Sequence, residues 1–144
     1  MINDAKIKLF LVDDDALFLK SLETEFLYHT DFIVETYSTG ELCIENLSKN
    51  PDVIILDYHL DGVEKNAMNG LETLDKIKDL YPDIPVVMLS SQDKIDVAVS
   101  CMHHKAFDYI VKSETAFLRL QKNIAAFFHY KKIEKELDWY MSRM

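Results

Sequence analysis

Leu9-Phe10-Leu11-Val12 runs directly into Asp13-Asp14-Asp15, and Val53-Ile54-Ile55-Leu56 runs into Asp57. Short apolar runs of this kind are typical of strands covered on both faces, as in a parallel sheet. Carboxylates at the ends of such strands lie at the edge where open α/β sheets bind their ligands. Acids that converge there repel one another by roughly 4 kcal/mol per close pair at an effective dielectric near 20. A divalent cation such as Mg²⁺, which prefers carboxylate, water and phosphate oxygens, relieves that repulsion, so the sequence predicts a metal and phosphate site.

Length, composition and charge limit the class of protein. The 144 residues suffice for one domain with a proper core, and 49% of them are hydrophobic, which is typical of a folded globular chain. A net charge of −9 argues against a nucleic-acid surface and against binding to anionic membranes. The sequence has no long apolar run for a membrane helix, and its first residues do not resemble a signal peptide. Cys43 and Cys101 lack CxxC spacing, so we expect reduced thiols in a cytoplasmic protein.

Strand-like and helix-like segments alternate five times along the chain. Apolar runs predict strands at Ile7–Val12, Phe32–Tyr37, Val53–Asp57, Val86–Ser90 and Asp108–Val111. Helical spacing of apolar residues follows each run, at residues 16–28, 41–47, 71–80 and 94–103 and in a last helix that opens with Ser113 as its N-cap. This alternation predicts an α/β fold with a doubly wound parallel sheet and right-handed crossovers.

Four short motifs occur at the ends of these predicted strands. They are LVDDD at residues 11–15, ILD at 55–57, MLSS at 88–91 and AFDYIVK at 106–112. Together and in this order, they resemble the receiver domain of two-component response regulators, over about residues 6–126. The resemblance implies the flavodoxin-like (βα)5 fold with strand order 2-1-3-4-5. It also implies a phosphorelay switch that is not an enzyme in its own right.

The resemblance assigns a role to each matching residue. Asp57 corresponds to the phosphoacceptor, which takes a phosphoryl group from a histidine kinase or a histidine phosphotransfer protein. Asp14 and Asp57 correspond to direct ligands of Mg²⁺ or Mn²⁺, Asp13 acts through a metal-bound water, and the backbone carbonyl of His59 is a further ligand. Such a site suits phosphoryl transfer, which depends mainly on positioning and on neutralising the phosphoryl oxygens.

Further roles follow from the same resemblance. Ser90 and Lys112 correspond to the hydroxyl and ammonium that hold the phosphoryl oxygens. Tyr109 corresponds to a switch aromatic that moves inward together with Ser90. His59 and Ser91 border the path of attacking water and tune the lifetime of the acyl phosphate. Asp15 precedes a helix and is expected to be an N-cap instead of a metal ligand.

The sequence departs from the family pattern at three places. Ser113 follows Lys112 where a proline is common, and Lys105 stands where a glycine usually precedes Ala106, which makes a left-handed backbone there costly by about 1 kcal/mol. About five residues are inserted within residues 60–68, between Asp57 and Gly70. The insertion is either a tolerated surface extension or a flap that shields the site or selects partners.

Domain limits, partners and rival functions complete the expectations. Residues 1–126 are expected to form the receiver domain, and residues 127–144 to extend the last helix, to form an interaction helix or to be the stub of a linker. Signalling would use the face of the fourth helix, fifth strand and fifth helix, toward an effector or a second copy. An aspartyl-phosphate hydrolase of the haloacid dehalogenase type would need a second Asp where His59 stands. A pseudo-receiver that binds partners without phosphorylation is disfavoured by the complete acceptor set.

Overall fold

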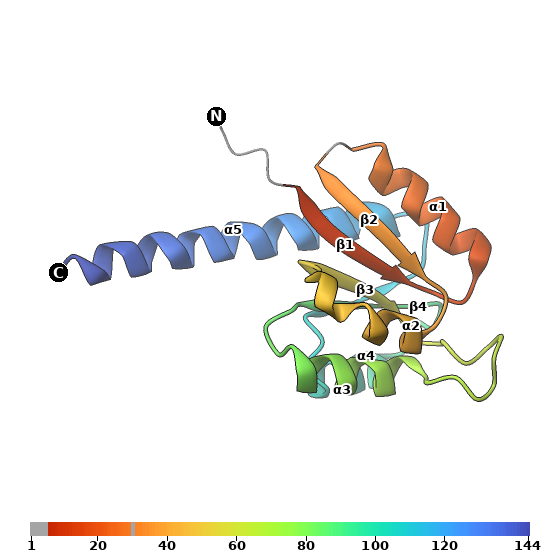
Figure 1. The fold of residues 1–144 in the computed structure, drawn as a ribbon. Coiled ribbons are helices and arrows are strands. Elements are labelled where there is room, and N and C mark those ends of the chain that lie inside the picture. The colour runs from red at the N-terminus through yellow and green to blue at the C-terminus, as the bar shows by residue number, and fades with distance from the viewer. Residues whose placement is uncertain (1–5, 30) are drawn as a thin grey trace.

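Five parallel strands and five α-helices alternate in a computed structural model, which describes residues 6–29 and 31–144 (Figure 1). The elements are β1 Ile7–Val12, α1 Ala16–Leu27, β2 Phe32–Tyr37, α2 Gly40–Glu45, a short 3-10 helix at Leu47–Lys49, β3 Val53–Asp57, α3 Gly70–Leu80, β4 Val86–Ser90, α4 Ile95–His103, β5 Asp108–Val111 and α5 Ala116–Ser142. The strand order is β2-β1-β3-β4-β5. The predicted doubly wound fold and strand order are therefore confirmed. The first five residues of the expected domain 1–126, including the stretch compared with signal peptides, lie outside the described residues, as does residue 30.

The central strands are apolar because helices cover both of their faces. All residues of β3 and β4 are buried, as are the last four residues of β1. The parallel register pairs Val12 with Leu56 and Asp57 with Leu89. The carboxyl ends of β1, β3 and β4 are therefore level, and the residues that follow them share one edge of the sheet.

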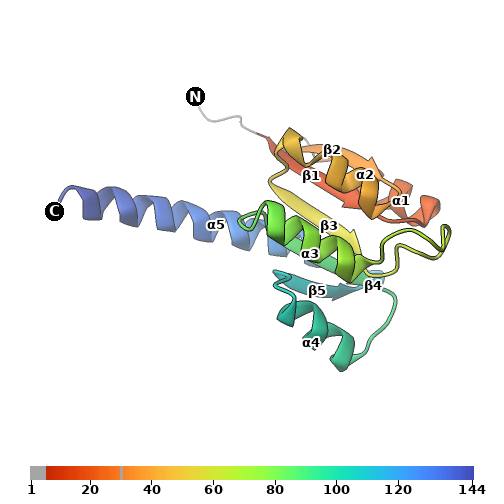
Figure 2. The same cartoon turned by 60° about the horizontal axis from the view of Figure 1, so that its bottom comes forward.

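Two separate cores lie on the two faces of the sheet. Phe10, Ile54 and Met88 pack with residues of α2, α3 and α4, whereas Leu9, Ile55 and Leu89 pack with residues of α1 and α5. Figure 2 shows α2, α3 and α4 on one side of the strands and α5 behind them. Cys43 and Cys101 are buried free thiols in the first of these cores, and burial raises their pKa values to about 12 and about 11.

Gly70 brings the start of α3 against the end of β3. A Cβ at this position would lie 2.5 Å from the carbonyl oxygen of Asp57, a distance that side chains do not tolerate. Asn69 caps the helix, because its side chain accepts from the Glu72 N–H while the Glu72 carboxylate accepts from the Asn69 N–H. This capping box fixes where α3 begins and therefore where the loop from Asp57 must end.

The last helix begins later than the sequence predicts and runs far past the sheet. Ser113 is not its N-cap: the Ser113 hydroxyl accepts from the Thr115 N–H, its carbonyl accepts from the Ala116 N–H, and the helix starts only at Ala116. Ser113 thus closes a turn that spaces Lys112 from α5. Leu120 and Ile124 are buried, whereas every residue from Lys132 onward is exposed, and Figure 1 shows this half of α5 projecting away from the sheet.

The backbone at Lys105 and the end of the second helix can also be compared with the sequence. Lys105 has a φ of 73°, so the backbone before Ala106 is left-handed although the residue is a lysine, at a cost of about 1 kcal/mol. The second helix ends at Glu45 instead of continuing to Leu47, because the chain tightens into the 3-10 turn Leu47–Lys49. Within the described residues, none of the helices combines the length and the apolar character that crossing a membrane requires.

Candidate functional site

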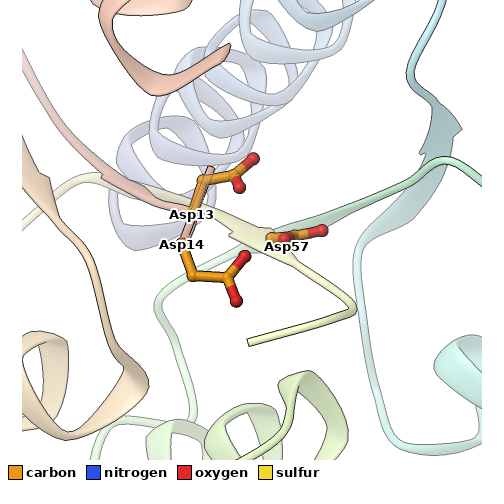
Figure 3. Close-up of side chains that lie close together, drawn as sticks. All are labelled: Asp13, Asp14 and Asp57. Atoms are coloured by element: carbon orange, nitrogen blue, oxygen red, sulfur yellow. The ribbon is translucent and has the colours of Figure 1, made fainter. Parts of the chain in front are cut away.

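Three carboxylates gather beyond the carboxyl ends of β1 and β3. Figure 3 shows the side chains of Asp13, Asp14 and Asp57, whose ligand atoms lie within 4.8 Å of one another. Asp13 and Asp57 are each only 3% exposed, and Asp14 is half-buried. Asp15, the fourth acid, instead accepts hydrogen bonds from the N–H groups of Leu17 and Phe18 as the N-cap of α1, which confirms its predicted role.

Lys112 provides the positive charge of the site. Its Nζ lies 2.9 Å from Asp13 Oδ2 and 3.3 Å from Asp57 Oδ1, and 4.5 Å from the centroid of the Phe18 ring. Burial alone would lower the pKa of Lys112, but the contacts with the two carboxylates outweigh burial and raise it. The ammonium is therefore held in its charged form between two acids.

One cation does not neutralise three clustered acids, two of which are buried. Burial, and then the nearby charge of Asp13, raise the pKa of Asp57 to about 7 in spite of Lys112. Asp13 Oδ2 is buried against the Lys112 ammonium. Three converging carboxylates with one ammonium leave negative charge uncompensated, so the donor set fits Mg²⁺.

Ser90 ends β4, one residue beyond the level of Asp57, and its side chain is fully buried. Its Oγ accepts a hydrogen bond from the N–H of Gln92 over 3.0 Å. The Tyr109 hydroxyl donates a hydrogen bond to the backbone carbonyl oxygen of Gln92. The side-chain Nε2 of Gln92 lies 3.1 Å from His59 Nε2. Gln92 therefore joins three residues to which the sequence assigned roles.

Sequence reasoning missed Gln92. A polar residue two positions after the Ser90 strand end was the available signal, but its contacts depend on the path of the loop before α4.

His59 is half-buried and donates its backbone N–H to Asp57 Oδ1 over 3.4 Å. Ser91 is exposed and Tyr109 is half-buried. The site thus places Asp13, Asp14, Asp57 and Lys112 together, with Ser90, Gln92 and His59 along its edge.

The loop between β3 and α3 also reaches the site. The N–H groups of Gly62 and Val63 donate to Asp14 Oδ2 over 3.0 Å and 3.1 Å. Neither residue carries a side-chain signal for such a contact, and the sequence alone did not predict it. The inserted segment therefore touches one of the three acids through its backbone.

A buried carboxylate beside an ammonium and two further carboxylates is a geometry that suits phosphoryl transfer. The sequence model of one protein family, the response regulator receiver domain, matches residues 9–124 of this chain. This chain belongs to that family. The receiver domain is thus a domain of two-component signal transduction, as its motifs predicted.

Known relatives of this receiver domain are longer proteins. It is 37% identical over 117 residues to a protein-glutamate methylesterase/protein-glutamine glutaminase of Clostridium acetobutylicum, a match covering 78% of this chain but only 32% of that protein. Its structure resembles the receiver domain of a LuxO repressor protein from Vibrio parahaemolyticus with a TM-score of 0.77, 22% identity and coverage of 92% of this chain and 97% of the other. It also resembles a chain in the CheX–CheY–BeF3–Mg complex from Borrelia burgdorferi, with a TM-score of 0.74 and 23% identity. That match covers 86% of this chain and 90% of the other.

Proposed function

We propose that Asp57 accepts a phosphoryl group from a histidine kinase or a histidine phosphotransfer protein, with Mg²⁺ or Mn²⁺ as cofactor. The observation that carries this proposal is the meeting of Asp13, Asp14 and Asp57 with the Lys112 ammonium at one edge of the sheet. A receiver without chemistry has no need to hold three acids together at an electrostatic cost. The membership of the chain in the receiver family supports the same reading.

The step is a displacement at phosphorus. An Asp57 carboxylate oxygen attacks the phosphorus of a phosphohistidine, the P–N bond breaks, and the imidazole leaves with the electron pair. Lys112 and the Ser90 hydroxyl hold phosphoryl oxygens, and Asp13, Asp14, Asp57 and the His59 carbonyl hold the cation, Asp13 through a water. The cation supplies positive charge that offsets the phosphoryl oxygens and lowers the repulsion met by the attacking carboxylate.

The contacts of Gln92 suggest how the site reports its state. The Ser90 hydroxyl now accepts from the Gln92 N–H, and the Tyr109 hydroxyl donates to the Gln92 carbonyl. When Ser90 turns toward a phosphoryl oxygen, it releases the Gln92 amide and thereby loosens the loop that holds Tyr109. Tyr109 then moves inward, and the face of α4, β5 and α5 changes for an effector or a second copy. His59 and Ser91 border the water path and set the acyl phosphate lifetime.

Other properties of the whole protein are part of the same proposal. The chain spans about a third of the methylesterase it resembles, so an effector domain with its own activity is compatible with this receiver. The receiver segment itself acts as a switch, in the cytoplasm, without binding nucleic acid or membrane. Residues 1–126 form the receiver, and residues 127–144 extend its last helix. A hydrolase of the haloacid dehalogenase type is disfavoured because His59 stands where its second Asp is needed.

Incubation of the chain with Mg²⁺ and acetyl phosphate tests this function. We expect a mass increase of one phosphoryl group that is labile to hydroxylamine, and its loss in Asp57→Asn. Asp61→Asn is the matched control, because Asp61 is an exposed acid in the loop after the same strand. An unmodified wild-type chain, both with acetyl phosphate and with a phosphorylated histidine kinase, would identify a pseudo-receiver and reject the proposal.

A further inference from the structure

The loop of residues 58–69 carries the inserted residues, and two of these contact the side chain of Asp14. Two consecutive N–H groups, those of Gly62 and Val63, donate to the same oxygen, Oδ2 of Asp14. Two N–H donors satisfy the two lone pairs of that carboxylate oxygen. Both bonds fall on Oδ2, so neither occupies Oδ1, the second oxygen of Asp14.

The identity of residue 62 matches this contact. A Cβ on Gly62 would lie 3.0 Å from Asp14 Oδ2, closer than about nine in ten real contacts of a Cβ, so the carboxylate would have to move by a few tenths of an ångström. Its φ is not in the left-handed region, so backbone conformation does not explain the glycine. Close approach to the carboxylate explains it instead. Val63 contributes through its backbone, because its side chain is 73% exposed.

The loop is fixed on both sides of these two amides. On one side, Leu60 is buried with 1% exposure. On the other side, the Met68 N–H donates to the Glu41 carboxylate over 2.8 Å, and the Gly70 N–H donates to the Tyr58 carbonyl over 3.0 Å. Figure 1 shows the loop, in yellow-green, reaching past the carboxyl ends of the strands. An anchored loop of this kind holds its amides in place at little further entropic cost.

We propose that the amides of Gly62 and Val63 are positioning groups for the cation. They hold Asp14 through Oδ2 and direct Oδ1 toward the place where Asp13 and Asp57 converge. This inference rests on the proposed function, since it concerns the metal of that same site. The inserted loop then sets how tightly this receiver binds Mg²⁺.

Two physical effects give the amides this role. Asp14 is half-buried beside two other acids, and without donors on Oδ2 its carboxylate turns toward water and away from their charges. Hydrogen bonds from outside the metal's own ligand shell orient a ligand, and their loss typically weakens metal affinity by 10- to 100-fold. Coupling of this kind is reciprocal, so the cation must in turn stabilise the loop against opening.

Val63→Pro and Val63→Ala form the matched pair that tests the proposal. Proline removes the N–H donor, whereas alanine keeps it and removes only the exposed side chain. By calorimetric titration of the unphosphorylated full chain with Mg²⁺, we expect the Kd to rise about tenfold in Val63→Pro. We expect it to stay unchanged in Val63→Ala. Gly62→Ala, which wedges a methyl group against Asp14, is expected to weaken binding in the same direction.

Amide hydrogen exchange supplies a second readout. In the wild type, Mg²⁺ should slow the exchange of the Gly62 and Val63 amides, while unfolding in urea without Mg²⁺ should be alike in all three variants. An unchanged or tighter Mg²⁺ Kd in both Val63→Pro and Gly62→Ala overturns the proposal. So does faster exchange of these amides on adding Mg²⁺, because the loop would then compete with the cation.

Different experimental results contradict the proposed phosphoacceptor function and the proposed positioning role. Mg²⁺ titration needs no phosphodonor, so wild-type chain that binds Mg²⁺ but is not modified by acetyl phosphate contradicts the phosphoacceptor function alone. Wild-type chain that is modified, with Mg²⁺ affinity unaffected by the Val63 and Gly62 substitutions, contradicts the positioning role alone.

Discussion

At the level of single residues, Asp57 is held in a state that favours its protonated form. Burial and the charge of Asp13 raise its pKa to about 7, against 3.8 for an ordinary aspartate. A carboxyl that binds its proton more tightly in the folded chain than in the unfolded chain makes folding less favourable as pH rises through that interval. The contribution of Asp57 to the free energy of unfolding therefore falls between pH 3.8 and about 7, so the buried carboxylate lowers the stability of the chain at neutral pH.

Replacing this carboxyl should stabilise the chain at high pH. In Asp57→Asn, without divalent cations, we expect a free energy of unfolding about 2 kcal/mol above wild type at about pH 8. The gain stays below the ~4 kcal/mol of the full pKa shift, because the substitution also removes a partner of Lys112. The difference should shrink as pH falls toward 3.8 and vanish below it, where the wild-type carboxyl becomes protonated in both the folded and the unfolded state.

Urea unfolding in the presence of a chelator, at several pH values, measures this difference. Asp61→Asn serves as the control, because an exposed carboxylate should give no such pH-dependent gain. An Asp57→Asn chain no more stable than wild type at high pH would show that Lys112 already compensates the buried charge.

At the level of elements, the junction between β3 and α3 decides where Asp57 lies. The close approach of Gly70 to the Asp57 carbonyl leaves no room for a side chain. We expect Gly70→Ala to lower the free energy of unfolding by about 1–3 kcal/mol, as overpacking typically does, and to displace the nucleophile. Chemical denaturation measures the first effect, and the rate of modification by acetyl phosphate measures the second.

Lys76→Ala is the matched control for this substitution. Lys76 lies on the exposed side of the same helix, so its replacement by alanine should change stability by no more than about 0.5 kcal/mol. Should Gly70→Ala behave like Lys76→Ala, the contact between α3 and β3 would not be tight.

The elements also show what the sequence can and cannot specify. All five strands have their predicted bounds, because each is an apolar run that ends at a polar residue or at a turn. The predicted start of α5 was wrong by two residues, since the N-cap position is Thr115 and not Ser113, because a serine that binds a nearby N–H serves a turn as well as a helix cap. The acids and Lys112 were predictable as side chains at strand ends. The contacts of the Gly62 and Val63 amides were not, because the Val63 N–H does not depend on its side chain and a glycine in a loop does not reveal which group lies against it.

At the level of the whole molecule, α5 packs against the core only with its first half. Leu120 and Ile124 fill the core beside α1, whereas the residues after Lys131 are exposed. A chain ending at Tyr130 should therefore unfold within about 0.5 kcal/mol of the complete chain, since no buried side chain is lost. Thermal and urea unfolding of the two chains measures the difference.

A shorter chain provides the control for this truncation. Ending at Arg119 removes Leu120 and Ile124, and the loss of two fully buried aliphatic side chains at about 2–5 kcal/mol each should prevent folding. A marked loss of stability in the chain ending at Tyr130 would place the boundary of the domain beyond residue 130.

The same helix has a mechanical consequence. Its 27 residues are continuous, so at 1.5 Å per residue it is a rod about 40 Å long, with about 18 Å of it beyond Tyr130. If the helix tilts by about 10° about a pivot at Leu120, Ser142 lies about 33 Å from the pivot and travels about 6 Å, whereas residues beside Leu120 hardly move. A small tilt at the packed end would therefore displace the exposed end of α5 by a larger distance than any residue beside the sheet.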